Sequence, residues 1–249
     1  AALNTGLGGA LGTEQIGALS TALVQVIRST ALAVLSTEQV AAFETEDIAA
    51  MRTSQIAALS TSGIAALTTD QVVALNTAQV RAITTAGIAV MSSEQVAALE
   101  SRDIAVLSTD QVRALSTDAV SALTTAQAQA VSTAGIAVLS TTQVQALGTG
   151  QVAALTTAQV QAITTAAIAA MTTDQVAAFE TEDIAALRTS QIAGLSTSTV
   201  AALTTSQIEA LTTAQIQAVT TSGMAALSTE QFAAIETRDI AALKTTQVA

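Results

Sequence analysis

Aliphatic residues recur along this chain with a period of eight. Rows of eight laid out from Leu3 all begin with Leu, Ile, Val, Met or Phe, and the frame continues to Ala249 without an insertion or deletion. Typical rows are LSTEQVAA (35–42) and LTTAQVQA (155–162). The third place is always Thr or Ser, the fifth is usually Gln, the sixth is usually apolar and the eighth is mostly Ala. We expect the first, sixth and eighth places to point inward and the second, fourth and seventh to face water.

Each octad is predicted to form one very short helix. One long helix is excluded, because eight residues at about 100° each rotate the apolar place by about 80° per row. The hydroxyl pair in the second and third places favours helix N-caps. We expect the third place, such as Thr37, to be the N-cap of a helix from the fourth place to the first place of the next row. The alternative register makes Ser36 the cap, in a capping box with Gln39.

Helices of this length are unstable alone, so neighbouring octads must hold them. Stacking predicts an all-α solenoid, a single array of 31 octads over residues 3–249 with two to three octads per coil. A β-solenoid is the alternative, but the VAAL runs and the low glycine content, 12 residues, favour helices. The stretch QVAAFETEDIAA at 39–50 recurs at 175–186, which indicates an internal duplication of residues 35–113 and 171–249.

The composition excludes most kinds of catalytic chemistry. The chain has no His, Cys, Pro, Trp or Tyr, and Lys244 is its single lysine, so its hydroxyls have no base to activate them. We therefore expect no enzyme, no catalytic, cofactor-binding or metal residues, and no cofactor. A net charge of -11 argues against nucleic acid as a partner. The apolar runs are too short for a membrane span, and residues 1–12 lack the features of a signal peptide.

Two features keep a ligand-binding alternative open. Acidic residues gather in two identical rows and offer oxygen ligands to Ca²⁺: Glu44, Glu46, Asp47, Glu180, Glu182 and Asp183. Arg102 and Arg238 stand in the related rows and weaken that alternative. Thr at a fixed spacing also suggests an ice-binding surface, unless capping occupies those hydroxyls.

The acidic rows have a purely structural interpretation as well. Three of the four acidic residues in the second place are followed eight residues later by a basic one, and Glu100, followed by Ser108, is the exception. Such pairs would fix the register of interchangeable rows: Glu44 with Arg52, Glu180 with Arg188, and Glu236 with Lys244. Exposed pairs of this kind contribute about 0–1 kcal/mol each.

The rows LTTAQVQA and LSTEQVAA resemble octapeptide arrays of large, acidic, cysteine-poor bacterial surface and secreted proteins of the adhesin type. The resemblance covers the whole chain and implies an extracellular, structural or adhesive role; it supplies no site residues. We expect a spacer or filament-forming solenoid, either excised from a longer array or stacking head to tail with further copies.

Overall fold

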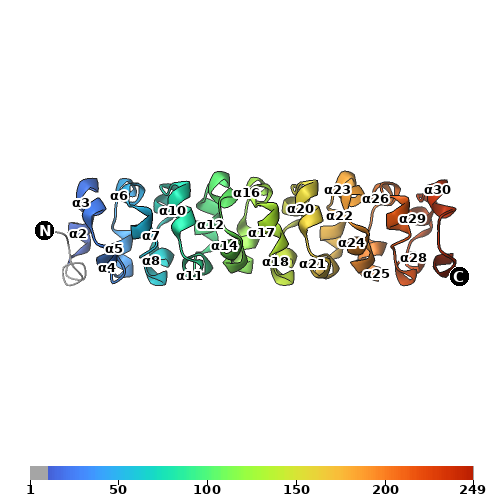
Figure 1. Ribbon diagram of the computed structural model, residues 1–249, viewed down its shortest axis with the longest axis horizontal. Helices are drawn as coiled ribbons and strands as arrows, with labels where there is room; N and C mark the ends of the chain where they lie inside the picture. The colour runs from blue at the N-terminus through green and yellow to red at the C-terminus, as the bar shows by residue number, and fades with distance from the viewer. Residues whose placement is uncertain (1–10, 249) are drawn as a thin grey trace. The chain divides into compact units, whose positions relative to one another are not determined.

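The computed structural model describes residues 11–248, and within them the backbone forms 30 short α-helices and no strand (Figure 1). The predicted all-α solenoid is confirmed, and the β-solenoid alternative is wrong. Each octad forms one helix of four to six residues, such as α5 (Thr37–Ala41) and α6 (Thr45–Ala50). An extended N-cap residue separates each helix from the turn before it, as at Ser36, where ψ is 166°.

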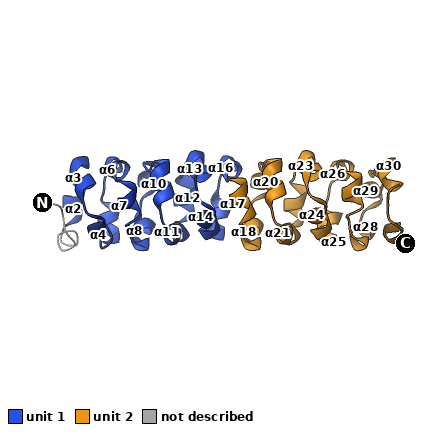
Figure 2. Ribbon diagram, viewed as in Figure 1, with its two compact units in different colours: residues 1–131 blue, residues 132–249 orange. Residues whose placement is uncertain are grey.

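Two compact units divide the chain, residues 1–131 and 132–249 (Figure 2). The described helices of the first unit are α2 (Thr13–Gly17), α3 (Thr21–Val26), α4 (Ser29–Leu32), α5, α6, α7 (Thr53–Ile56), α8 (Thr61–Ala66), α9 (Thr69–Val73), α10 (Thr77–Ala82), α11 (Thr85–Ala89), α12 (Ser93–Ala98), α13 (Ser101–Ala105), α14 (Thr109–Ala114), α15 (Thr117–Ala122) and α16 (Thr125–Ala130).

The described helices of the second unit are α17 (Thr133–Ala137), α18 (Thr141–Gln145), α19 (Thr149–Ala153), α20 (Thr157–Ala162), α21 (Thr165–Ala170), α22 (Thr173–Ala177), α23 (Thr181–Ala186), α24 (Thr189–Gly194), α25 (Thr197–Ala201), α26 (Thr205–Glu209), α27 (Thr213–Ile216), α28 (Thr221–Ala225), α29 (Thr229–Ala233), α30 (Thr237–Ile240) and α31 (Thr245–Val248). The octad frame continues through the boundary between the units unchanged.

Three octads make one coil. Within each unit a helix packs against the helices three octads before and after it, where the unit contains them, as α20 does with α17 and α23. Each unit therefore contains three stacks of helices, and α20, α23 and α26 follow one another along the upper edge of Figure 1. A coil of 24 residues places equivalent side chains above one another, which builds a continuous core from helices that could not stand alone.

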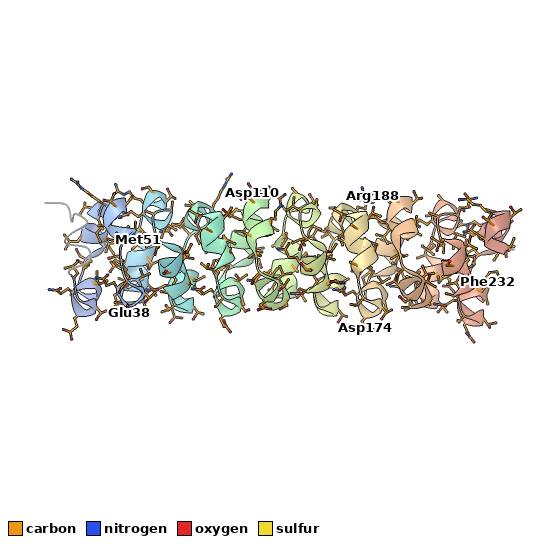
Figure 3. All side chains as sticks on the ribbon, turned by 90° about the horizontal axis from the view of Figure 1, so that it is seen from below. Glu38, Met51, Asp110, Asp174, Arg188 and Phe232 are labelled. Atoms are coloured by element: carbon orange, nitrogen blue, oxygen red, sulfur yellow. The ribbon has the colours of Figure 1, made fainter. Side chains whose placement is uncertain are left out.

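The core consists of the first and sixth places, as predicted. Val176 and Ile184 are completely buried, and the methionines and Phe43 fill first or sixth places inside the coils; Figure 3 shows Met51 within the ribbon. The expectation for the eighth place is wrong, because residues such as Ala42 are only half-buried. The fifth place takes its position in the interior instead, and Gln55 and Gln191 there are fully buried.

The N-cap lies one residue earlier than the preferred register placed it. In most rows the second-place hydroxyl accepts the N3 backbone N–H: Ser36 Oγ accepts from Gln39 at 3.2 Å, and Thr172 Oγ1 accepts from Gln175 at 3.2 Å. Helices begin at the third place and end at the sixth, seventh or eighth. Thr37 is therefore the first helical residue and not the cap. The capping box decides the register, because it serves two backbone N–H groups and the third-place cap would serve one.

A pair of adjacent alanine substitutions tests this register. Thr172→Ala removes the cap of α22 and should lower the free energy of unfolding by about 1 kcal/mol. Thr173→Ala, one residue later and exposed, should change it by less than about 0.5 kcal/mol. Chemical denaturation followed by far-UV circular dichroism compares the two variants. A larger loss from Thr173→Ala would restore the third-place register.

Candidate functional site

Glutamine in the fifth place completes the cap of its own helix. Its side-chain Oε1 accepts the backbone N–H of the N-cap residue: Thr204 N–H donates to Gln207 Oε1 at 2.9 Å, while Gln207 N–H donates to Thr204 Oγ1 at 3.1 Å. Arg188 cannot cap through its own side chain, yet its backbone N–H donates to Gln191 Oε1 at 2.8 Å. The glutamine therefore preserves half of the capping box even where the second place is not a hydroxyl.

The other end of the same amide bonds to the preceding coil. Gln207 Nε2 donates to the carbonyl oxygens of Val176 at 3.1 Å, Ala177 at 3.2 Å and Phe179 at 2.8 Å. These carbonyls lie at the C-terminal end of α22, four octads before α26. We call the hydrogen bonds from a fifth-place Nε2 to these carbonyls the inter-coil bridge.

The inter-coil bridge recurs with a constant offset of 28 residues and Nε2–O distances of 2.6–2.9 Å. The glutamines that make this bond are Gln39, Gln55, Gln71, Gln79, Gln95, Gln111 and Gln127 in the first unit and Gln175, Gln191, Gln207, Gln215, Gln231 and Gln247 in the second. A helix of five or six residues leaves most of its carbonyls without an internal partner. The bridge supplies those carbonyls with donors in the interior, where water cannot.

Removing one inter-coil bridge should be costly. Gln207→Leu keeps the side chain's volume but leaves the Thr204 N–H and the Phe179 carbonyl without their partner and removes one of the donors to the Val176 carbonyl, so the free energy of unfolding should fall by about 2–4 kcal/mol. Gln161→Leu is the matched control, because Gln161 is exposed and donates only to the carbonyl of Ala186, at 2.8 Å. Its cost should stay below about 1 kcal/mol. Equal losses in the two variants, measured by denaturant titration, would contradict the role of the bridge.

Aspartate replaces glutamine in four rows, at Asp47, Asp103, Asp183 and Asp239, and each is 1–3% exposed. A carboxylate has no hydrogen to give, so none of them can form the inter-coil bridge while charged. Asp103 Oδ2 accepts the Glu100 backbone N–H at 3.2 Å, which is the position of a glutamine Oε1. Its other oxygen, Oδ1, is buried and has no hydrogen-bond partner within the described residues, and the same is true of Asp47 Oδ2.

Burial raises the pKa of three of these groups. Desolvation, with the nearby charges of Glu180 and Glu182, raises the pKa of Asp183 from 3.8 to about 6, and a backbone hydrogen bond at Glu180 opposes the rise. Desolvation together with its own acidic neighbours raises the pKa of Asp47. Desolvation also raises the pKa of Asp103 against the backbone hydrogen bond at Glu100 and the positive charge of Arg102.

Asp239 differs from the other three because its carboxylate has partners. Thr213 Oγ1, on the helix of the preceding coil in the same stack, donates to Asp239 Oδ1, and Arg238 Nε lies 3.7 Å from that oxygen. A hydroxyl from the preceding coil therefore compensates this row.

The acidic rows give no geometric support to a calcium site. Within residues 11–248, no three acidic side chains come close enough together to hold a metal ion. The ion pairs expected eight residues apart are also not formed there. Arg102 contacts Glu100 and Arg238 contacts Glu236, each within its own row.

Third-place hydroxyls lie on the outside of the coils. They are exposed or half-buried throughout the described chain, because the second place does the capping. Asp110, Asp174 and Arg188 also lie at the outer surface in Figure 3. Sequence reasoning missed the buried role of the fifth place, although the frequent Gln at that place was the available signal.

These features define the class: an α-solenoid repeat protein whose coils are joined by buried side-chain amides. The chain belongs to the ALTTAQ repeat family, whose model matches six overlapping stretches, residues 40–77, 72–101, 96–133, 129–157, 153–179 and 176–213, which together cover more than half of the chain. The family's six letters occur unchanged at 210–215, where they hold the core residue Leu211, the cap Thr212 and the bridging Gln215. A search of curated proteins gave no match. Over the described residues, no helix has the length and apolar character that crossing a bilayer requires.

Proposed function

We propose that this repeat protein is a structural spacer of a bacterial extracellular surface or matrix protein, and that its coils also associate end to end. The inter-coil bridge carries the proposal. The bridge repeats the same interaction from coil to coil, so that added octads add length. Among the described residues, no cleft brings catalytic groups together. The extracellular, bacterial setting rests on the resemblance of rows such as LTTAQVQA (155–162) to surface-protein arrays.

The last described coil supports end-to-end association. Sixth-place residues are buried from Ile16 to Met224, whereas Phe232, Ile240 and Val248 are 43%, 36% and 63% exposed. Earlier sixth-place residues of the second unit have a further coil beside them and are buried. A further coil, from a continuation of the chain or from a second copy, would bury these three. Full burial of such a side chain contributes about 1.5–3 kcal/mol, and covering the exposed part of these three contributes a share of that.

Light scattering after size-exclusion chromatography, with electron microscopy of the same sample, tests the proposal. The 249-residue chain should form particles whose mass rises with concentration and whose length grows by stacking. Phe232→Glu should abolish that growth, because it places a charge in the contact. Val73→Glu is the control, since Val73 is similarly exposed, at 51%, but lies on α9 within the array. Particles of single-chain mass at every concentration would contradict association, and a compact globule would contradict the spacer role as well.

A regular hydroxyl surface is the second candidate function. The observation in its favour is that third-place residues such as Thr173 and Thr181 are exposed and are not consumed by capping. Binding to ice should then slow recrystallisation, and replacing the third-place Thr of one stack, such as Thr157, Thr181 and Thr205, by Lys should remove the effect. Recrystallisation at the rate of a matched albumin solution would contradict it.

A further inference from the structure

Three buried carboxyls occupy the place from which glutamine bridges the coils. The constant offset of 28 residues places the Leu19 carbonyl opposite Asp47, the Leu75 carbonyl opposite Asp103 and the Leu155 carbonyl opposite Asp183. A charged carboxylate faces these oxygens with lone pairs only, so the contact is repulsive and costs desolvation energy as well. The unpartnered oxygens of Asp47 and Asp103 mark this mismatch.

One proton corrects the mismatch. A neutral carboxylic acid has an O–H donor and keeps an acceptor oxygen, as the glutamine amide has N–H donors and an acceptor. Asp103 already uses Oδ2 as the acceptor for the Glu100 N–H, which leaves Oδ1 as the atom to protonate. The side chain is one methylene shorter than glutamine, so the coils must approach slightly or one water molecule must bridge the O–H to the carbonyl.

We propose that Asp47, Asp103 and Asp183 are protonation switches of coil packing: as neutral acids they restore the inter-coil bridge, and as carboxylates they leave it broken. The array is then firmest under mildly acidic conditions and weakest at these three rows near neutrality. This inference does not depend on the proposed spacer role, because it concerns the stability of the fold itself.

The charges around each switch favour the protonated form of its carboxyl group. Asp183 lies beside Glu180 and Glu182, and of the helices stacked against it α20 carries no charge and α26 carries Glu209. On α19, whose C-terminal carbonyls face Asp183, there is no charged residue. Arg188, the nearest cation along the chain, directs its guanidinium to the Ile163 carbonyl and Gln191 Oε1, each at 3.3 Å, and not to Asp183.

Asp47 has surroundings comparable to those of Asp183. Around Asp47 the acidic groups are Glu44 and Glu46 in its own row, with Glu14 on α2 and Asp70 on α9, while α3 carries no charge.

Asp103 has a more mixed environment. Glu100 and Arg102 lie in its own row and pair with each other, Arg81 lies on α10, Asp70 lies on α9, and α16 carries no charge. We therefore expect Asp103 to be the weakest of the three switches.

The direction of the pH effect follows from proton linkage. The pKa of Asp183 is about 6 in the folded state and 3.8 otherwise, so the folded state binds the proton more tightly. Its contribution to stability is complete below about pH 3.8 and is lost as pH rises through about 6. Exposed Glu38, Glu94 and Glu230 act in the opposite direction, since hydrogen bonds at the helix start lower their pKa below 4.5. Protonation of these three glutamates therefore lowers stability only at pH values below the range in which Asp183 titrates.

Thermal unfolding of the 249-residue chain by circular dichroism at about pH 7.5 and about pH 5 tests the switches. Tm should rise by several degrees on acidification. The triple variant Asp47→Asn, Asp103→Asn, Asp183→Asn should melt higher than wild type at the upper pH and lose most of the acid-induced gain. Acidification also reduces the net negative charge of any acidic protein, so a charge-matched control is required.

The control variant removes the same number of charges from exposed fourth-place residues that lie away from the three switches: Asp110→Asn, Asp118→Asn and Asp174→Asn. It should retain the acid-induced gain. Asp239→Asn is a second control, since that buried carboxylate already has Thr213 and Arg238 as partners. The proposal is overturned if the buried triple variant keeps the full gain, or if the exposed triple variant loses as much of it.

Discussion

A helix of five residues cannot satisfy its own backbone, and this constraint shapes the whole array. Its first N–H groups and last carbonyls lack internal partners, and in so short a helix these two sets are nearly all of the polar groups. The fifth-place glutamine serves both sets with one amide. Its oxygen takes the N–H at the start of its own helix, and its nitrogen gives hydrogens to the carbonyls that end a helix of the coil before. Capping and stacking are therefore one interaction.

This coupling explains why the octad is so strict. Moving the cap by one residue would move the amide away from its carbonyls, and inserting a residue would break the offset of 28 that every bridge shares. The apolar places alone would tolerate some slippage, because Leu, Val and Ile in a thin core are nearly interchangeable. Directional hydrogen bonds do not tolerate slippage. We therefore infer that the glutamines fix the register that ion pairs were expected to fix.

The sequence predicted the helices, the first- and sixth-place core and the solenoid, because each follows from periodicity and from the instability of isolated short helices. It left the number of octads per coil open, since a period of eight contains no information on how often the chain turns. It also misplaced the cap at Thr37, because both hydroxyl places satisfy the usual preference for Ser and Thr. The capping box of Ser36 with Gln39 distinguishes them, and the same Gln39 amide also donates to the carbonyl of Leu11, 28 residues away.

The acidic rows are arranged differently in the structure than they are along the sequence. Read along the sequence, Glu44, Glu46 and Asp47 form one cluster suited to a cation. In the structure Asp47 turns into the core while the two glutamates remain exposed, so the cluster does not exist as a ligand set. The three residues interact electrostatically: the negative charges of the two exposed glutamates make it harder for the buried Asp47 carboxyl to lose its proton. Because each coil contacts only its neighbours, an uncompensated row weakens the array locally, and the rows on either side keep the fold together.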